Sequence, residues 1–161
     1  MTPGGQHRPP ESGHWKPGSR ALVDAARRQF TTLGEQWTDL RAQLFEELAE
    51  VDGPASAYDM AEKLSKRTGR RVSANSVYRI LDLFVANDLA RRIESRNAYV
   101  VNTHPSCSHD CIFLICERCG RIDHLDDDSL ATQMRARATE SGFSPRRPVL
   151  ELLGLCRDCQ P

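Results

Sequence analysis

The sequence predicts an α+β fold, in which an N-terminal winged-helix domain precedes a small α/β domain with a four-cysteine metal site. Three features of the 161-residue chain support this fold. Apolar residues recur at helical spacing through the first half of the chain. Short segments rich in strand-forming residues follow them. Two Cys-x-x-Cys pairs then lie in the last third of the chain and offer four thiols to a metal ion.

Four helices are predicted before residue 89, and each is bounded by a capping or breaking residue. The first covers Ser19–Leu33, and we expect Tyr58, Ala61 and Leu64 to face the core from the third. The fourth carries a buried apolar stripe that includes Val77, Leu81 and Phe84. The bounding signals are Gly34 after the first helix, Thr38 or Asp39 before the second and Gly53-Pro54 after it, Ser56 and Thr68-Gly69 around the third, and Ser73 before the fourth.

A β-hairpin is predicted after the helices. Leu89–Glu94 and Ala98–Val101 have strand character and are joined by Ser95-Arg96-Asn97. Several short helices followed by a two-stranded hairpin is the order of elements in a winged helix. We therefore assign residues 19–101 to this domain, and we expect residues 1–18, which lack an apolar period, to form a disordered tail.

Positive charge is concentrated around the fourth helix and the hairpin. The whole chain is neutral, with 22 basic and 22 acidic residues, but residues 66–96 contain eight basic and three acidic ones. Such clustering favours binding to the phosphates of double-stranded DNA. The alternative is a solvated basic face without a partner. The longest apolar stretch, Cys111–Cys116, is far shorter than the about 20 residues of a membrane span, so we expect a cytoplasmic protein without a membrane partner.

The fourth helix carries polar groups that suit a DNA groove near its N-terminal end, where a recognition helix reaches the bases. Arg79 could pair with a guanine. Tyr78 could contact a thymine methyl group or a phosphate, or it could be an amphipathic residue at the edge of the core. The candidate DNA-binding residues of this helix are Ser73, Asn75, Ser76, Tyr78 and Arg79.

The two cysteine pairs predict a structural zinc site formed by Cys116, Cys119, Cys156 and Cys159. Each pair can present two thiolates from a tight turn, and four sulfurs complete the tetrahedral shell of a closed zinc site. Gly120 follows the first pair and can adopt the positive φ that such a turn favours. A redox motif, a disulfide framework and iron in the same cage are the alternatives.

Three strands and one helix are predicted around these cysteines. The strands are 112–115, 121–125 and 149–153. The helix starts at Asp126-Asp127-Asp128 and ends at Ser141-Gly142. We interpret the three acidic residues as capping charge that complements the helix dipole.

Several of these segments resemble the ferric uptake regulator (Fur) superfamily over roughly residues 20–159. The stretch Ser73–Phe84 resembles its recognition helix, Thr38 with Arg41 resembles its early helical signature, and Cys-x-x-Cys-Gly with a distant second pair resembles its zinc knuckle. The segments most similar to the zinc uptake regulator (Zur) branch are Gly154-Leu155-Cys156, Ser56-Ala57-Tyr58-Asp59 and Glu94–Val100.

The resemblance implies a homodimer that binds palindromic operators as a zinc-loaded repressor of zinc uptake genes, with one structural and one regulatory Zn²⁺ per chain. It implies that residues 109–161 form the dimerisation and zinc-binding domain, that 102–108 form a hinge and metal-binding loop, and that Arg41 contacts DNA. A small-molecule substrate is not expected.

A regulatory zinc site is expected at the junction of the two domains. By analogy with the zinc branch, His109 and His124 occupy ligand positions, although relatives usually have a glutamate at the second. Two further family ligands are replaced here by Arg91 and Asn102. Cys107 and Cys111 are therefore the candidates that complete the site, with His104 in reserve. The alternatives are a buried hydrophobic role for Cys111 and a surface thiol for Cys107.

Two other functions are compatible with the same residues. A chain of this fold could sense iron, manganese or peroxide, although a thiol-rich ligand set argues against the first two. An enzyme using zinc or a redox dithiol is the second alternative. The sequence contains no His-Glu-x-x-His motif, nucleophile elbow or phosphate-binding loop, so we expect no catalytic activity.

Overall fold

The computed structural model describes residues 20–103, 112–125, 127–146 and 149–161. The predicted tail (1–18), most of the predicted hinge (102–108) and the candidate ligands His104, Cys107, His109 and Cys111 lie outside these residues, so their assignments stay predictions. None of the helices in the described part of the chain is long and apolar enough to cross a membrane.

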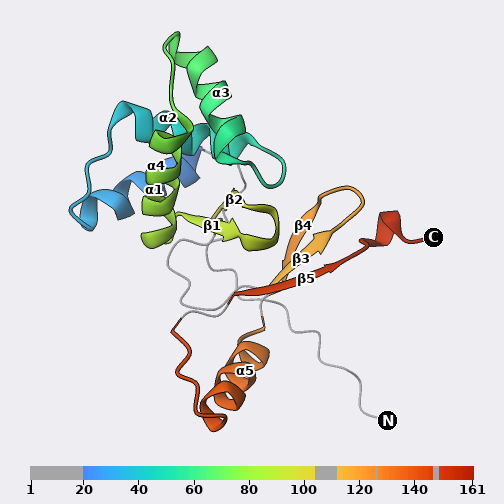
Figure 1. Ribbon diagram of the computed structural model, residues 1–161. Helices are drawn as coiled ribbons and strands as arrows, with labels where there is room; N and C mark the ends of the chain where they lie inside the picture. Colours follow the sequence, from blue (N-terminus) through green and yellow to red (C-terminus); the bar gives the residue numbers. More distant parts are fainter. Residues whose placement is uncertain (1–19, 104–111, 126, 147–148) are drawn as a thin grey trace.

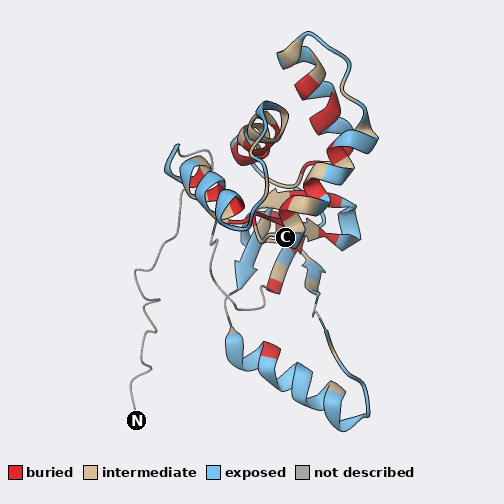
Figure 2. Cartoon of the chain, turned by 90° about the vertical axis from the view of Figure 1, so that its left-hand side faces the viewer, coloured by how far each residue is buried: buried red, intermediate tan, exposed pale blue. Residues whose placement is uncertain are grey.

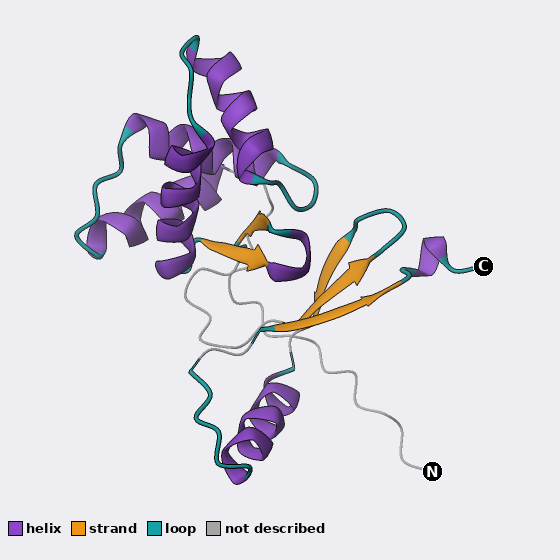
Figure 3. Cartoon of the chain, viewed as in Figure 1, coloured by secondary structure: helices purple, strands orange, loops and turns teal. Residues whose placement is uncertain are grey.

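The N-terminal part is a bundle of four helices that leads into a β-hairpin, the wing (Figures 1 and 3). The predicted winged-helix order is therefore confirmed. Thr38, Ser56 and Ser73 cap the second, third and fourth helices with their side chains, as predicted. The elements are α1 Arg20–Thr32, α2 Asp39–Glu50, α3 Ala57–Thr68, α4 Ala74–Ala86, β1 Ala90–Ile93, the 3₁₀ turn η1 Glu94–Arg96 and β2 Ala98–Val101.

The core of this domain is built around aromatic residues contributed by different helices. Phe84 of α4 packs edge-to-face on Phe30 of α1 and on Phe45 of α2, with ring centroids 5.8 and 5.6 Å apart. All three are fully buried, and Val77 and Leu81 extend the same buried face of α4. Edge-to-face pairs add about 1 kcal/mol each to the stabilisation from burial. α4 is thus fixed by one face, while its opposite face stays accessible (Figure 2).

The wing is fastened to α3 and α4. Tyr99 of β2 forms a β-bridge with Ala55, which precedes Ser56, the N-cap of α3. The Tyr99 hydroxyl donates a hydrogen bond of 3.2 Å to Asp82 of α4. Burial, assisted by the Asp82 charge, raises the pKa of Tyr99 to about 12, so the hydroxyl keeps its proton at neutral pH. The wing and α4 therefore form one packed unit.

The C-terminal part is a three-stranded mixed sheet of order β4-β3-β5, with a separate helix. Its strands are β3 Ile112–Cys116, β4 Ile122–Leu125 and β5 Leu150–Gly154. The central strand β3 runs antiparallel to β4 and parallel to β5. The sheet is followed by the 3₁₀ turn η2 Arg157–Cys159.

The helix α5, Asp128–Glu140, connects β4 to β5 and begins as predicted. The Asp127 carboxylate caps it by accepting the Leu130 N–H at 3.0 Å. Of its thirteen residues, Ala131 alone is buried. Figures 1 and 2 show the helix standing away from the sheet, with nearly all of its surface exposed.

Candidate metal centre and nucleic-acid interface

The sheet brings the four predicted zinc ligands together. Cys116 is the last residue of β3, and Cys156 follows β5 closely. Because these strands are parallel and Cys116 pairs with Gly154, their carboxyl ends meet at one edge of the sheet. Each cysteine offers one sulfur, and the four sulfurs of Cys116, Cys119, Cys156 and Cys159 all lie within 4.8 Å of one another.

The backbone turns at the two cysteine pairs position these sulfurs. Gly120 has φ +76°, as predicted for the turn, and its N–H donates to the Cys116 carbonyl at 2.9 Å. In the second pair the Cys159 N–H donates to the Cys156 carbonyl at 2.9 Å. Both pairs therefore form similar tight knuckles. The sulfurs of Cys119 and Cys156 lie 3.7 Å apart, which is far longer than the about 2.05 Å of a disulfide. The four cysteines are free thiols, which removes the disulfide alternative.

The electrostatics of the cluster favour a bound cation. The pKa of Cys116 is lowered to about 6, because the backbone N–H groups of Cys156 and Cys119 donate to its sulfur. The pKa of Cys159 is raised to about 12, because its thiol hydrogen-bonds to the Cys156 side chain and is also buried. The raised pKa of Cys159 follows from the crowding of the thiols, since four adjacent thiols cannot all ionise without a compensating charge. A divalent ion supplies that charge, and four sulfurs are the donor set of a structural zinc site.

The exposed face of α4 lies beside an exposed aromatic residue of α3. Asn75, Ser76 and Arg79 are exposed, and Tyr78 is half-buried. The Tyr78 ring packs edge-to-face on Tyr58, with centroids 6.1 Å apart. Tyr58 is 69% exposed, so the prediction that it faces the core was wrong.

The reason for this error is visible in the spacing of α3. Its buried residues are Ala57, Met60, Ala61 and Leu64, which follow the i, i+3, i+4, i+7 pattern of one helix face. Tyr58 lies one residue after the start of this pattern and is therefore rotated out of it. An exposed tyrosine next to the recognition helix suits contact with nucleic acid, and sequence reasoning missed it.

Most of the predicted basic cluster is occupied by contacts within the chain. Five of its eight members have partners: Lys66 pairs with Glu62, Arg67 with Glu46 and Glu47, Arg91 with Asp88, Arg92 with Glu94, and Arg96 donates to a backbone carbonyl. Within the described part of the chain, Arg70, Arg71 and Arg79 have no hydrogen bond or ion pair from their side chains. These three arginines are available to phosphates or bases.

Arg41 has a structural role in this chain. Its guanidinium lies over the Phe30 ring, 5.4 Å from the centroid. It also donates to the Gln36 carbonyl and to the Glu35 carboxylate. These contacts brace the loop between α1 and α2. The predicted contact of Arg41 with DNA stays a prediction.

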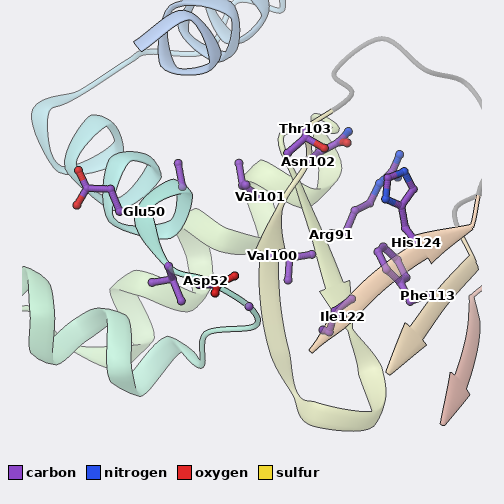
Figure 4. A pocket seen from close by; sticks show the side chains of 13 residues that line it. Glu50, Asp52, Arg91, Val100, Val101, Asn102, Thr103, Phe113, Ile122 and His124 are labelled. Carbon is purple, nitrogen blue, oxygen red and sulfur yellow. The ribbon is translucent and has the colours of Figure 1, made fainter. Parts of the chain in front are cut away.

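A cavity of about 520 Å³ lies between the wing and the C-terminal sheet (Figure 4). Arg91 and Asn102 line it from the wing side, and Phe113 and His124 line it from the sheet. Arg91 forms a 2.9 Å ion pair with Asp88, and the Asn102 side chain donates to the Asp88 carbonyl at 2.7 Å. Arg91 and Asn102, which replace two metal ligands of the family, therefore line the same cavity as His124.

A winged helix with available arginines, joined to a small sheet domain with a four-cysteine metal site, defines a metal-responsive regulator of transcription. Residues 32–153 match the Ferric uptake regulator family, and the chain belongs to this family. The resemblance seen in the sequence is thus confirmed, and the protein is a transcription regulator and not an enzyme.

Several proteins similar to this chain are zinc uptake regulators. The zinc uptake regulation protein of Escherichia coli (strain K12) is 29% identical over 142 residues, which are 88% of this chain and 82% of that protein. The holo crystal structure of XcZur has a TM-score of 0.78 at 34% identity and covers 88% of this chain and 98% of its own. A zinc uptake regulator complexed with zinc and DNA has a TM-score of 0.81 at 27% identity, covering 87% and 93%. This similarity supports DNA binding.

The apo structure of XcZur is less similar in shape. Its TM-score is 0.51, although it is 33% identical and covers 90% of this chain and 99% of its own. Sequence identity and coverage are therefore nearly the same as for the holo form. The arrangement of this chain is nearer to the holo form of that relative than to its apo form.

Proposed function

We propose that this protein is a zinc-responsive repressor in the cytoplasm, which binds palindromic operators as a homodimer when its regulatory site holds Zn²⁺ and represses zinc uptake genes. The observation that carries the proposal is the cavity between the wing and the C-terminal sheet. His124 lines it, and so do Thr103 and Phe113, which lie in the described parts of the chain before and after the cysteine- and histidine-containing segment 104–111.

The residues around the cavity limit which ligands could complete a regulatory site. The Arg91 guanidinium has no lone pair for a metal ion. The Asn102 side chain is 5% exposed and already engaged with Asp88. We therefore assign the regulatory zinc to His124 together with Cys107, His109 and Cys111, with His104 in reserve. Imidazole and thiolate ligands favour zinc over manganese or ferrous iron, which prefer more oxygen donors.

Zinc in such a site would act on the arrangement of the two domains. A metal ion held by both can shift their equilibrium only by the difference in its affinity for the alternative arrangements. The favoured arrangement would hold two recognition helices about 34 Å apart, which is one turn of DNA. By linkage, operator DNA would tighten zinc binding by the same factor.

The exposed apolar residues of the C-terminal domain support the homodimer. Leu152 and Leu153 of β5 are 59% and 52% exposed. Met134 of α5 is 48% exposed. A helix of thirteen residues with one buried side chain is marginal in water unless something else packs against it. A second copy of the chain would cover both surfaces.

Leu152→Asp tests the dimer. The carboxylate would be buried in the subunit interface without a partner, which costs about 3 kcal/mol or more and weakens dimerisation at least about a hundredfold. We expect a monomer in light scattering at micromolar concentration. Ser141→Asp, which adds the same charge at an exposed position after α5, should stay dimeric. If the Leu152 variant stayed dimeric, this surface would be excluded as the dimer interface.

His109→Ala with His124→Ala tests the regulatory site. Zinc per chain should fall from about two to about one, because the four-cysteine site is untouched, and zinc-dependent DNA binding should be lost. The measurements are zinc content and affinity for a duplex that the wild type selects from random sequence. Asp123→Ala, an exposed neighbour of His124, is the control. One tight zinc ion with unchanged DNA binding would indicate a constitutive DNA-binding protein, and restoration by manganese or iron would indicate another signal.

A further inference from the structure

The tip of the wing is hydrogen-bonded to the C-terminal sheet. The Glu151 carboxylate of β5 accepts the Glu94 N–H at 2.6 Å on one oxygen and the Ser95 N–H at 3.0 Å on the other. The next wing residue, Arg96, donates from its guanidinium to the Cys116 carbonyl at 3.3 Å. Three successive residues of η1 are therefore joined to β3 and β5, and Figure 1 shows the wing beside this sheet.

Glu151 supplies a contact that the wing cannot make by itself. The first residues of a 3₁₀ turn leave N–H groups without partners inside the turn. The residue before η1 is Ile93, which has no side-chain acceptor, and no cap hydrogen bond is formed there. The Glu151 carboxylate accepts these N–H groups instead, although it lies 57 residues from Glu94 and 56 from Ser95 in the sequence. Burial raises the pKa of Glu151, but the hydrogen bonds from Ser95 and Glu94 outweigh it and lower the pKa, so the acceptor is ionised at neutral pH.

A short path leads from Glu151 to the recognition helix. Asn97, which follows η1, has φ +46° and donates from its side-chain amide to the Tyr78 hydroxyl of α4 at 3.4 Å. The adjoining strand is fixed to α4 by the bond from Tyr99 to Asp82. Since the wing and α4 are one packed unit, a contact that fixes the wing tip also fixes the direction of α4.

We propose that Glu151 is a positioning residue for DNA binding, whose carboxylate holds the wing tip against the C-terminal sheet and so sets the orientation of the recognition helix relative to the dimer. This inference rests on the proposed function. The contact occurs in an arrangement that is nearer to the holo form of XcZur than to its apo form.

Glu151→Gln and Glu151→Ala test the proposal. In the Gln variant the amide oxygen can accept one N–H, but the amide NH₂ faces the other donor. We expect the metal-loaded Gln variant to bind the duplex selected by the wild type about tenfold more weakly, and the Ala variant more weakly still. Zinc content and dimerisation should not change. Glu140→Gln, which removes an exposed carboxylate of α5, should bind like the wild type.

Two readouts separate positioning from a loss of fold. Hydrogen exchange should accelerate for both the Glu94 and Ser95 amides in the Ala variant and for at least one of them in the Gln variant, while amides of the α4 core keep their protection. Residual dipolar couplings should report a variable orientation between the domains. Wild-type exchange rates, a fixed orientation or unchanged DNA affinity would each overturn the proposal.

These readouts are independent of the regulatory metal. If the wild type bound DNA equally well with and without exchangeable zinc, the proposed function would fail. Glu151→Gln would still be expected to weaken DNA binding and to expose the wing-tip amides. The two failures can therefore be distinguished.

Discussion

Cys159→Ser is expected to release the structural metal ion and to unfold the C-terminal sheet. Cys159 is one of four sulfurs within 4.8 Å, and these sulfurs join the end of β3 to the segment after β5. Structural zinc contributes about 10–16 kcal/mol in small metal-dependent peptides, which is as large as the about 5–15 kcal/mol that stabilises a typical domain. A domain of about 50 residues has too small a core to compensate. The measurements are zinc content and hydrogen exchange.

The loss should be confined to one domain. Amides of β3 should lose protection, whereas those of α4 should keep it, because the aromatic core around Phe84 contains no part of the metal site. Asp158→Asn is the matched control, since it lies between Cys156 and Cys159 but removes only an exposed ion pair with Arg121. We expect that control to lose less than about 1 kcal/mol. If the Cys159 variant kept its zinc and its β3 amides stayed protected from exchange, a structural role for the site would be contradicted.

Local patterns in the sequence were sufficient to predict the helices and the four-cysteine metal site. Ser56 forms a full capping box with Asp59, and Ser73 and Thr38 cap as their residue types suggest. Cys-x-x-Cys-Gly encodes a knuckle because both the sulfur spacing and the positive φ of Gly120 are local requirements. Features of this kind depend on residues within one turn of the chain, and a single sequence therefore contains them.

Long-range contacts could not be predicted in this way. The parallel pairing of β3 with β5 depends on how the chain folds back through α5, and the strand pattern does not specify it. The same holds for Glu151, whose partners lie more than 50 residues away. Arg67 was counted as a DNA-facing charge, but it binds Glu46 and Glu47 of α2. Charge counting identifies a basic region but not which side chains within it are available.

The regulatory site remains a prediction, which rests on the resemblance to the zinc branch and on the concentration of cysteine and histidine. Cys107, His109 and Cys111 lie in a segment without apolar periodicity, and the structure describes only its flanks and His124. Sequence reasoning found the segment because soft ligands are concentrated there. It could not tell that Arg91 and Asn102 face the same cavity as His124, and this fact now restricts the remaining ligands.

Among substitutions of the three available arginines, Arg79→Ala is expected to have the largest effect on DNA binding. Arg79 is exposed in the first half of α4, and its side chain has no partner among the described residues, so no stabilising contact is lost with it. A bidentate pair with guanine contributes about 1–3 kcal/mol of discrimination, so affinity for the selected duplex should fall between about fivefold and a hundredfold. Fluorescence anisotropy measures this loss, and the melting temperature should stay unchanged.

The kind of contact can be identified by comparing Arg79 with Arg70, which is also exposed and also unpaired in the described structure. A phosphate contact is independent of sequence, so Arg70→Ala should weaken binding to all duplexes alike and reduce the slope of log affinity against log salt by about 1. Arg79→Ala should instead reduce the difference between the selected duplex and its single-base variants. Arg137→Ala on α5 controls for net charge, because Arg137 pairs with Glu140 of the same helix. If Arg79→Ala changed the salt slope and left base discrimination intact, α4 would contact the DNA backbone there and not the bases.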